Sequence, residues 1–139
     1  MTVVVLDTNV VVAALRSGGG RSRSVLRRAI DGRDVPLFGT TLWLEYEEIL
    51  GRGVADGATS RAERETVLAA LVTAGRWVQI YYGWRPNLPD EGDNHLVELA
   101  LAGNAESIIT WNPRDIAHGD LVWPGLSVQT PQDYLEDTS

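Results

Sequence analysis

The sequence contains no cysteine and no lysine among its 139 residues. Without cysteine, neither a disulfide framework nor a thiolate zinc site can form, and two histidines alone make a weak case for zinc. Any metal ion bound by this chain must therefore be held mainly by oxygen atoms. All 12 basic side chains are arginines, which also counts against enzymes that depend on a lysine at the active site.

Long hydrophobic runs are absent too. No apolar stretch approaches the roughly 20 residues that a membrane-spanning helix needs, and Asp7 comes too early for the segment before it to be a signal peptide. We therefore expect a cytoplasmic protein with no membrane partner. With 44% hydrophobic and 22% charged residues, the composition is that of an ordinary globular protein, so residues 1–139 are expected to form one domain.

The formal net charge of −7 is unevenly distributed along the chain. Residues 1–33 carry six arginines against two acids, whereas residues 86–139 carry one arginine against ten acids. The arginine-rich front could contact phosphates along a bound strand, and we take Arg16, Arg21 and Arg23 as candidates for these contacts. A solvated helix face explains these arginines equally well.

Short apolar runs alternate with segments of helical spacing along the whole chain. Strands are predicted at residues 3–6, 35–38, 77–82, 107–110 and 126–129. Helices are predicted between them, including one capped by Thr41, one that begins with a capping box at Ser60, and one that begins at Asp93. This alternation predicts an α/β fold, a three-layer α/β/α sandwich around a mostly parallel sheet.

Several acids should meet at the carboxyl ends of these strands, where open parallel sheets place their functional crevice. Asp7 follows the first strand, Asn112 and Asp115 follow the strand at 107–110, and Asp93 begins the preceding helix. Each has a simpler explanation as well. Asp7 before Thr-Asn is typical of a turn, and Asp93 suits the first turn of a helix.

Helix geometry separates three glutamates at positions 45, 47 and 48. With residues about 100° apart, Glu45 lies roughly 85° from the centre of the apolar face, against roughly 115° for Glu47 and 145° for Glu48. Glu45 is thus the one best placed to lean inward, although a solvated helix acid is an equal alternative from this geometry alone.

Carboxylates that gather in one place repel one another unless a cation lies among them. We therefore expect Mg²⁺, or Mn²⁺ with the same oxygen ligands, bound by Asp7, Glu45, Asp93 and Asp115 as metal-binding and catalytic residues. Such a site can activate water and neutralise charge on a phosphate, and either one or two ions would fit.

Four pieces of the sequence, in this order and spacing, resemble the PIN domain family, and more narrowly its toxin-like nucleases of the VapC kind. They are residues 3–12 (VVVLDTNVVV), 45–50 (EYEEIL), 90–100 (DEGDNHLVELA) and 108–115 (IITWNPRD). The resemblance implies a compact α/β/α fold and a metal-dependent endoribonuclease. It also implies the toxin half of a toxin–antitoxin pair, with RNA as substrate, an antitoxin as partner and a homodimer as a common state.

The resemblance also implies roles for individual residues. Asp7, Glu45 and Asp93 fall on the family's three principal acids, and Thr8, Asn9 and Thr110 match positions that support the first acid by hydrogen bonds. Many members carry an acid where this chain has Asn112, so Asp115 is our candidate for the missing charge. The departure at Asn112 leaves an alternative open, a PIN-like module that binds RNA or a protein without cutting.

Two other enzyme classes also carry an aspartate at the end of a first strand. They are the haloacid-dehalogenase-like phosphatases and the response-regulator receivers, and both normally need a lysine near that acid. The chain has none, and the phosphatase pattern would also require an acid at Asn9. We therefore prefer the nuclease.

Overall fold

The computed structural model describes residues 1–16, 20–53, 57, 59–80, 94–117 and 125–138. Its strands form one parallel sheet in the order β3-β2-β1-β4-β5. Their bounds are β1 Thr2–Leu6, β2 Asp34–Phe38, β3 Arg76–Trp77, β4 Ser107–Ile109 and β5 Ser127–Gln129. The predicted α/β fold with a mostly parallel sheet is confirmed, and every strand pair in the described residues is parallel.

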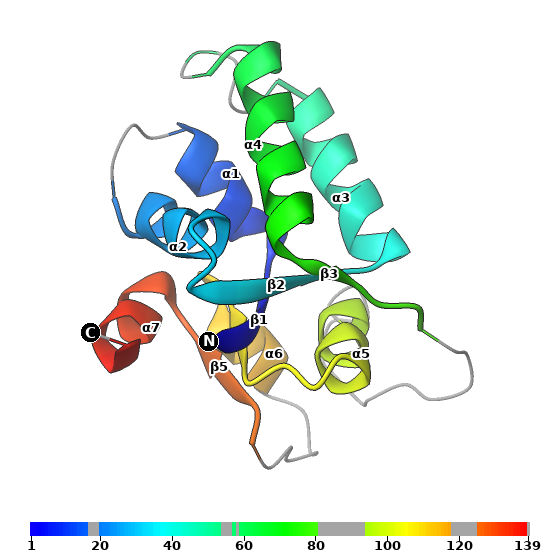
Figure 1. Cartoon of the computed structure of the whole chain (residues 1–139), viewed down its shortest axis with the longest axis vertical. Helices are drawn as coiled ribbons and strands as arrows, with labels where there is room; N and C mark the ends of the chain where they lie inside the picture. Colours follow the sequence, from blue (N-terminus) through cyan, green and yellow to red (C-terminus); the bar gives the residue numbers. More distant parts are fainter. Residues whose placement is uncertain (17–19, 54–56, 58, 81–93, 118–124, 139) are drawn as a thin grey trace.

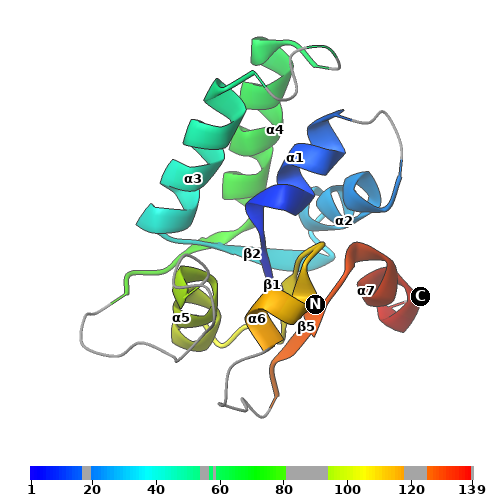
Figure 2. The same cartoon turned by 180° about the vertical axis from the view of Figure 1, so that it is seen from behind.

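Helices cover both faces of this sheet, which gives the predicted three layers. Figures 1 and 2 show α1 to α4 gathered on one side of the strands and α5 and α6 on the other, while α7 packs beside α2. The helices are α1 Thr8–Arg16, α2 Arg21–Ile30, α3 Thr40–Gly51, α4 Arg61–Ala74, α5 Asn94–Ala102, α6 Pro113–Ala117 and α7 Pro131–Thr138.

The core lies on both sides of the central strand β1. Val4, Val5 and Leu6 are at most 1% exposed, and Leu37 of β2 and Ile108 of β4 are fully buried beside them. A strand of a parallel sheet that is covered on both faces is apolar throughout rather than alternating, as the run at residues 3–6 already indicated. The buried central strand β1 therefore ends directly before Asp7.

Local signals predicted some element boundaries and missed others. The capping box at Ser60 is confirmed, because its hydroxyl accepts from the Glu63 N–H and the Glu63 carboxylate accepts from the Ser60 N–H. The cap at Thr41 is wrong, since the N-cap of α3 is Gly39, two residues earlier, and Thr41 lies inside the helix. The strand predicted at 77–82 extends only over Arg76–Trp77 in the described residues.

Gly75 ends α4 at a point where the backbone passes very close to β2. A Cβ atom there would lie 2.3 Å from the Pro36 carbonyl oxygen and 2.5 Å from the Phe38 ring. Only glycine fits this approach. No helix within the described ranges is long and apolar enough to cross a membrane.

Candidate active site

Asp7 stands at the carboxyl end of the central strand. Its N–H donates to the Ile109 carbonyl oxygen at 3.0 Å, which continues the pairing of β1 with β4, and its own carbonyl oxygen accepts from the Val10 N–H at 3.0 Å in the first turn of α1. The residue is therefore fixed by a strand on one side and a helix on the other. Its carboxylate is only partly buried and lies at the edge of the sheet.

Thr110 holds one oxygen of that carboxylate. Its hydroxyl donates to Asp7 Oδ2 at 2.7 Å, and the same hydroxyl oxygen accepts from Asn9 Nδ2 at 3.3 Å and from the Asn112 N–H at 3.1 Å. Because two donors occupy the oxygen of Thr110, its single hydrogen is directed at Asp7. Thr110 is fully buried, so this orientation is well protected from water.

Glu45 reaches the same edge from α3. The Thr8 hydroxyl donates to Glu45 Oε1, and His95 Nε2 lies 3.2 Å from Glu45 Oε2. Glu47 and Glu48 are exposed, and Glu48 pairs with Arg52 on the helix surface. Of the three glutamates considered from sequence, Glu45 is the one whose carboxylate turns toward the strand ends.

Tyr46 ties the helix that carries Glu45 to the strand that carries Asp7. Its side chain is 1% exposed, and its hydroxyl donates to the carbonyl oxygen of Leu6, the residue immediately before Asp7. Burial raises the pKa of Tyr46 well above its ordinary value, and the charges of Asp7 and Glu45 raise it further. The phenol therefore stays protonated and keeps donating.

The two carboxylates influence each other electrostatically. Burial raises the pKa of Asp7, the Thr110 hydrogen bond and the Thr8 N–H oppose this, and the charge of Glu45 raises it again. The hydrogen bond from His95 lowers the pKa of Glu45 against the effect of its burial, with a further lowering by Thr8. Ionised Asp7 is therefore unfavourable in the folded protein by itself, and a bound cation would relieve it.

The other residues predicted from sequence fall in different places. Asp93 lies outside the described residues. Asn112 and Asp115 are exposed on the turn and helix after β4, and no interaction within the described residues joins Asp115 to Asp7 or Glu45. Thr8 was expected to support Asp7 by hydrogen bonding. Its hydroxyl donates to Glu45 instead, and its backbone N–H hydrogen-bonds Asp7.

The three candidate arginines lie on α1 and α2. Arg16 is the last residue of α1 and Arg21 the first residue of α2, and both are exposed. Arg23 is partly buried and lines a groove near Glu63 of α4.

His95 is the residue that sequence reasoning missed. It was given no role because neither histidine has a spacing typical of paired metal ligands. Its position two residues after Asp93, at the start of a helix directed to the same sheet edge, was the available signal. Its Nδ1 is buried and has no hydrogen-bond partner among the described residues.

The chemistry of the described donors fits a hard divalent ion. Asp7 and Glu45 supply carboxylate oxygens at one edge, and neither is neutralised there by an arginine among its hydrogen-bonding partners in the described residues. No three acids or histidines of the described residues are close enough to hold a metal together. Asp7 and Glu45 are therefore the two carboxylates that the described residues bring to this site.

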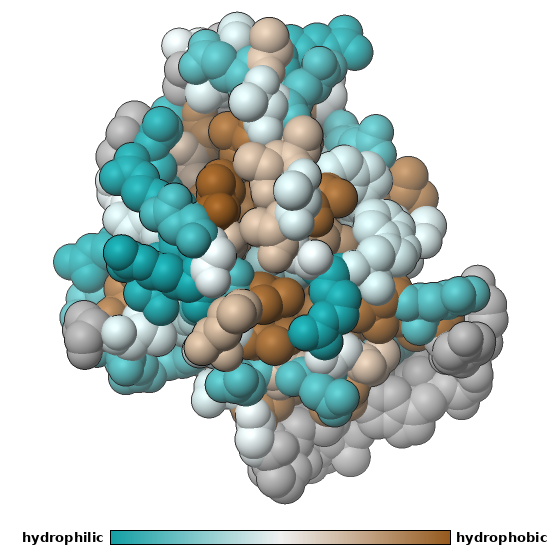
Figure 3. Space-filling view, viewed as in Figure 1, coloured by the Kyte–Doolittle hydropathy of each residue, from teal (hydrophilic) through white to brown (hydrophobic). Residues whose placement is uncertain are grey.

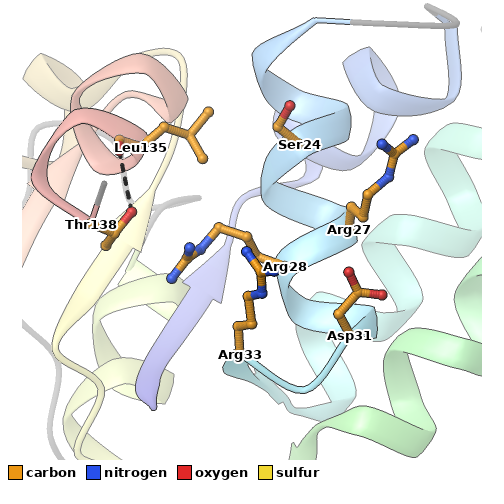
Figure 4. A pocket seen from close by; sticks show the side chains of 7 residues that line it. All are labelled: Ser24, Arg27, Arg28, Asp31, Arg33, Leu135 and Thr138. Carbon is orange, nitrogen blue, oxygen red and sulfur yellow. Dashed lines mark hydrogen bonds between the residues drawn. The ribbon is translucent and has the colours of Figure 1, made fainter.

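A second polar region lies at the amino ends of the strands, opposite to the carboxylates. Figure 4 shows Arg27, Arg28 and Arg33 around a pocket of about 520 Å³ between α2 and α7. Arg28 is already paired there, with its Nε 3.0 Å from Asp34 Oδ2. Since Asp34 begins β2 whereas Asp7 follows β1, and the two strands are parallel, the pocket and the carboxylates lie at opposite ends of the strands.

Comparison with known proteins gives a family match and a fold match. A family model described as PIN domain matches residues 3–114. The structure of VapBC2 from Rickettsia felis bound to a DNA fragment from their promoter is similar, with a TM-score of 0.57 and 12% sequence identity. The alignment covers 92% of this chain and 98% of that chain. No curated protein matches the sequence.

Proposed function

Because the chain belongs to the PIN domain family, we propose that it is a metal-dependent endoribonuclease and the toxin of a toxin–antitoxin pair. PIN domains are generally nucleases, so hydrolysis of a nucleic acid is the family's ordinary chemistry. The observation that carries the proposal is the meeting of Asp7 and Glu45 at one strand edge, where burial and the charge of Glu45 both raise the pKa of Asp7.

The residues that would hold Mg²⁺ or Mn²⁺ are Asp7, Glu45 and Asp93. In this proposal Asp115, from the helix after β4, would be the fourth ligand, and Asn112 would be a supporting residue. A bound ion of this kind neutralises charge on the phosphate and makes a bound water more acidic. The resemblance of the four sequence pieces to VapC-like nucleases supports this assignment.

The chain's own residues orient these ligands. The Thr110 hydroxyl donates to Oδ2 of Asp7, and the Thr8 N–H also hydrogen-bonds the carboxylate, so its orientation is fixed. Thr8 and His95 each hold one oxygen of Glu45, so its carboxylate keeps a fixed plane at the sheet edge. Outer partners of this kind tune and position metal ligands, and their loss typically costs about 10- to 100-fold in affinity or activity.

RNA cleavage is tested with purified protein and a mixed RNA pool in Mg²⁺, in Mn²⁺ and in excess chelator. We expect cleavage only with metal, and its loss in Asp7→Asn. Glu48→Gln is the matched control, because Glu48 lies on the exposed side of the same helix that carries Glu45. Cleavage that persists in chelator, or in Asp7→Asn, contradicts the mechanism.

The position of Asn112 keeps one other function in view, a PIN-like module that binds RNA or protein without cutting. It predicts binding of the same RNA pool with no cleavage under any metal condition. Asn112→Asp separates the two, because restoring an acid at this position should raise the cleavage rate of a weak enzyme and leave a pure binding module inactive.

A groove between the helices on one face supports the antitoxin part of the proposal. Leu15 of α1, Leu26 and Ile30 of α2 and Val67 of α4 line it, and it encloses about 330 Å³. Figure 3 shows apolar surface gathered in this region, where α1 and α2 face α4. An apolar helix of a small protein would fit such a groove, with the Arg23 side chain among its lining residues.

The antitoxin is tested by expression. We expect the chain to be toxic when expressed alone, and a small neighbouring reading frame to relieve that toxicity. Ile30→Arg should abolish relief by the partner while leaving RNA cleavage unchanged, since Ile30 lies in the groove and apart from the carboxylates. Harmless expression and the absence of such a frame would remove the toxin assignment and leave the nuclease.

A further inference from the structure

We propose that the exposed indole of Trp111 is a stacking platform for an unpaired base of the RNA substrate, beside the bond that is cut. This inference rests on the proposed function and adds a specificity-determining residue to it. It starts from an indole that is held firmly by hydrogen bonds and yet left open to solvent.

Two hydrogen bonds hold Trp111 in place. Its indole Nε1 donates to Ser22 Oγ at 2.8 Å, and its backbone N–H donates to Asn9 Oδ1 at 3.2 Å. Ser22 of α2 is 5% exposed, so the indole donates to a buried hydroxyl. The side chain nevertheless remains 40% exposed. A ring that is already fixed loses little conformational entropy when a ligand stacks on it.

The indole lies at the edge that carries the carboxylates. Trp111 directly follows Thr110, whose hydroxyl donates to Asp7, and both residues share Asn9 as a hydrogen-bond partner. A base that rests on Trp111 would therefore belong to a nucleotide close to the phosphate held beside Asp7. The same chain segment that orients Asp7 presents the aromatic face.

Two exposed arginines belong to the chain segments that hold the indole. Arg21 precedes Ser22 at the start of α2, and Arg114 lies on α6 three residues after Trp111. A nucleotide offers a flat base and a phosphate together, and an exposed indole is a surface on which such a base can stack.

The other described tryptophans have a different setting. Trp43 makes edge contacts with Phe38 at 6.0 Å and Tyr46 at 6.2 Å between ring centroids, and Trp77 packs against Trp43 at 6.4 Å. Within the described residues, Trp111 has no such ring contact. Trp77 is 51% exposed, so exposure alone does not distinguish the two, and Trp77→Ala is a matched control.

The test measures binding of single-stranded RNA oligonucleotides that each carry one abasic position. It uses the Asp7→Asn background so that the RNA stays intact, with cleavage by the wild-type chain recorded separately. Loss of a stacked base weakens binding by roughly 10- to 100-fold. We expect this loss at one position near the cleaved bond. Trp111→Ala should show the same loss on intact RNA and no further loss with that abasic oligonucleotide.

Two further variants separate stacking from folding. Trp111→Phe should retain most of the binding because it keeps an aromatic face, whereas Trp111→Leu should bind like Trp111→Ala. Equal binding by Trp111→Leu, Trp77→Ala and the parent would overturn the inference, as would an abasic penalty that persists in full without the indole. If RNA binding depends on Trp111 but the wild-type chain cleaves no RNA, the nuclease proposal is wrong and the stacking proposal holds.

Discussion

An aspartate lies at each end of the parallel strands, Asp34 at the amino ends and Asp7 at the carboxyl ends, and the two have different partners. Asp34, at the start of β2, is 1% exposed and receives two hydrogen bonds from the guanidinium of Arg28, at 3.0 and 3.4 Å. Burial, together with the nearby Asp34 carboxylate, raises the pKa of Tyr134 to about 12 beside it. Arg28 also lies 6.0 Å from the centre of the Tyr134 ring.

Asp7, at the end of β1, has no such cation. Within the described residues it is supported by the Thr110 hydroxyl and the Thr8 N–H, and its ionisable neighbours are Glu45 and His95. At the first site Arg28 supplies the positive charge and forms an ion pair with Asp34. At the second site no arginine pairs with Asp7 within the described residues, and His95 contacts the neighbouring Glu45.

The largest expected effect comes from Glu45 itself. Glu45→Gln should lower RNA cleavage by about 100- to 1,000-fold, the size of effect seen when one group that stabilises the transition state is removed. Glu48→Gln, on the exposed side of α3, should leave cleavage unchanged. The measurement is the initial rate on one RNA at saturating Mn²⁺. Similar losses in both variants would show that α3 as a whole, and not its inward carboxylate, matters.

Arg28→Met should produce the reverse pattern at the other edge. Removing the guanidinium leaves the carboxylate of Asp34 buried without its ion-pair partner, which costs about 3 kcal/mol in the free energy of unfolding. Cleavage per folded molecule should not change. Urea titration followed by circular dichroism gives the stability. Arg28→Met with Asp34→Leu should recover most of the loss, since the double variant buries no charge.

Thr110→Val tests the hydrogen bond that supports Asp7, and its expected effect on cleavage is smaller than that of Glu45→Gln. The substitution keeps the shape but removes the hydroxyl that donates to Asp7, so cleavage should fall about 10- to 100-fold. Thr110→Ser keeps the hydroxyl and should retain most of the activity. The check is the Mn²⁺ concentration needed for half-maximal cleavage, which should rise in the valine variant. If the serine variant is equally impaired, the missing methyl group is responsible.

The smallest effect is a gain of stability. Because the pKa of Asp7 is raised in the folded protein, its favourable contribution to stability is fully present below the pKa of an unfolded aspartate and is lost as pH rises through the folded value. Ionised Asp7 therefore destabilises the metal-free protein at pH 7. Asp7→Asn should raise the Tm at pH 7 in chelator, with no gain near pH 3. A lower Tm at pH 7 would contradict this account of the site.

Much of the fold was predictable because its signals are local. The capping box at Ser60 and the apolar run at residues 3–6 depend on a few neighbouring residues, and the structure confirms both. Gly39 was missed as the N-cap of α3 because a glycine cap makes no side-chain hydrogen bond that a pattern can reveal. Helix α6 was missed although Pro113 stands at its first position, where proline is favoured.

The candidate site was predictable in outline but not in its contacts. Position at strand ends indicated Asp7, and helix geometry favoured Glu45 over Glu47 and Glu48. The hydrogen bond of Thr8 to Glu45 and the approach of His95 join residues 37 and 50 positions apart, and no periodicity in the sequence encodes such pairs. They follow only from the way α1, α3 and α5 pack around the end of β1.

The tether from Tyr46 to the carbonyl oxygen of Leu6 has a consequence for redesign of the chain. It joins α3 to β1 directly, so the separation of Asp7 and Glu45 is decoupled from the path of the polypeptide between them. Insertions in the turn after Gly32 should be tolerated as a result, including a peptide tag or a split point between two complementing fragments. Pairing of β1 with β2 and the Tyr46 hydrogen bond would together bring the two acids back into place.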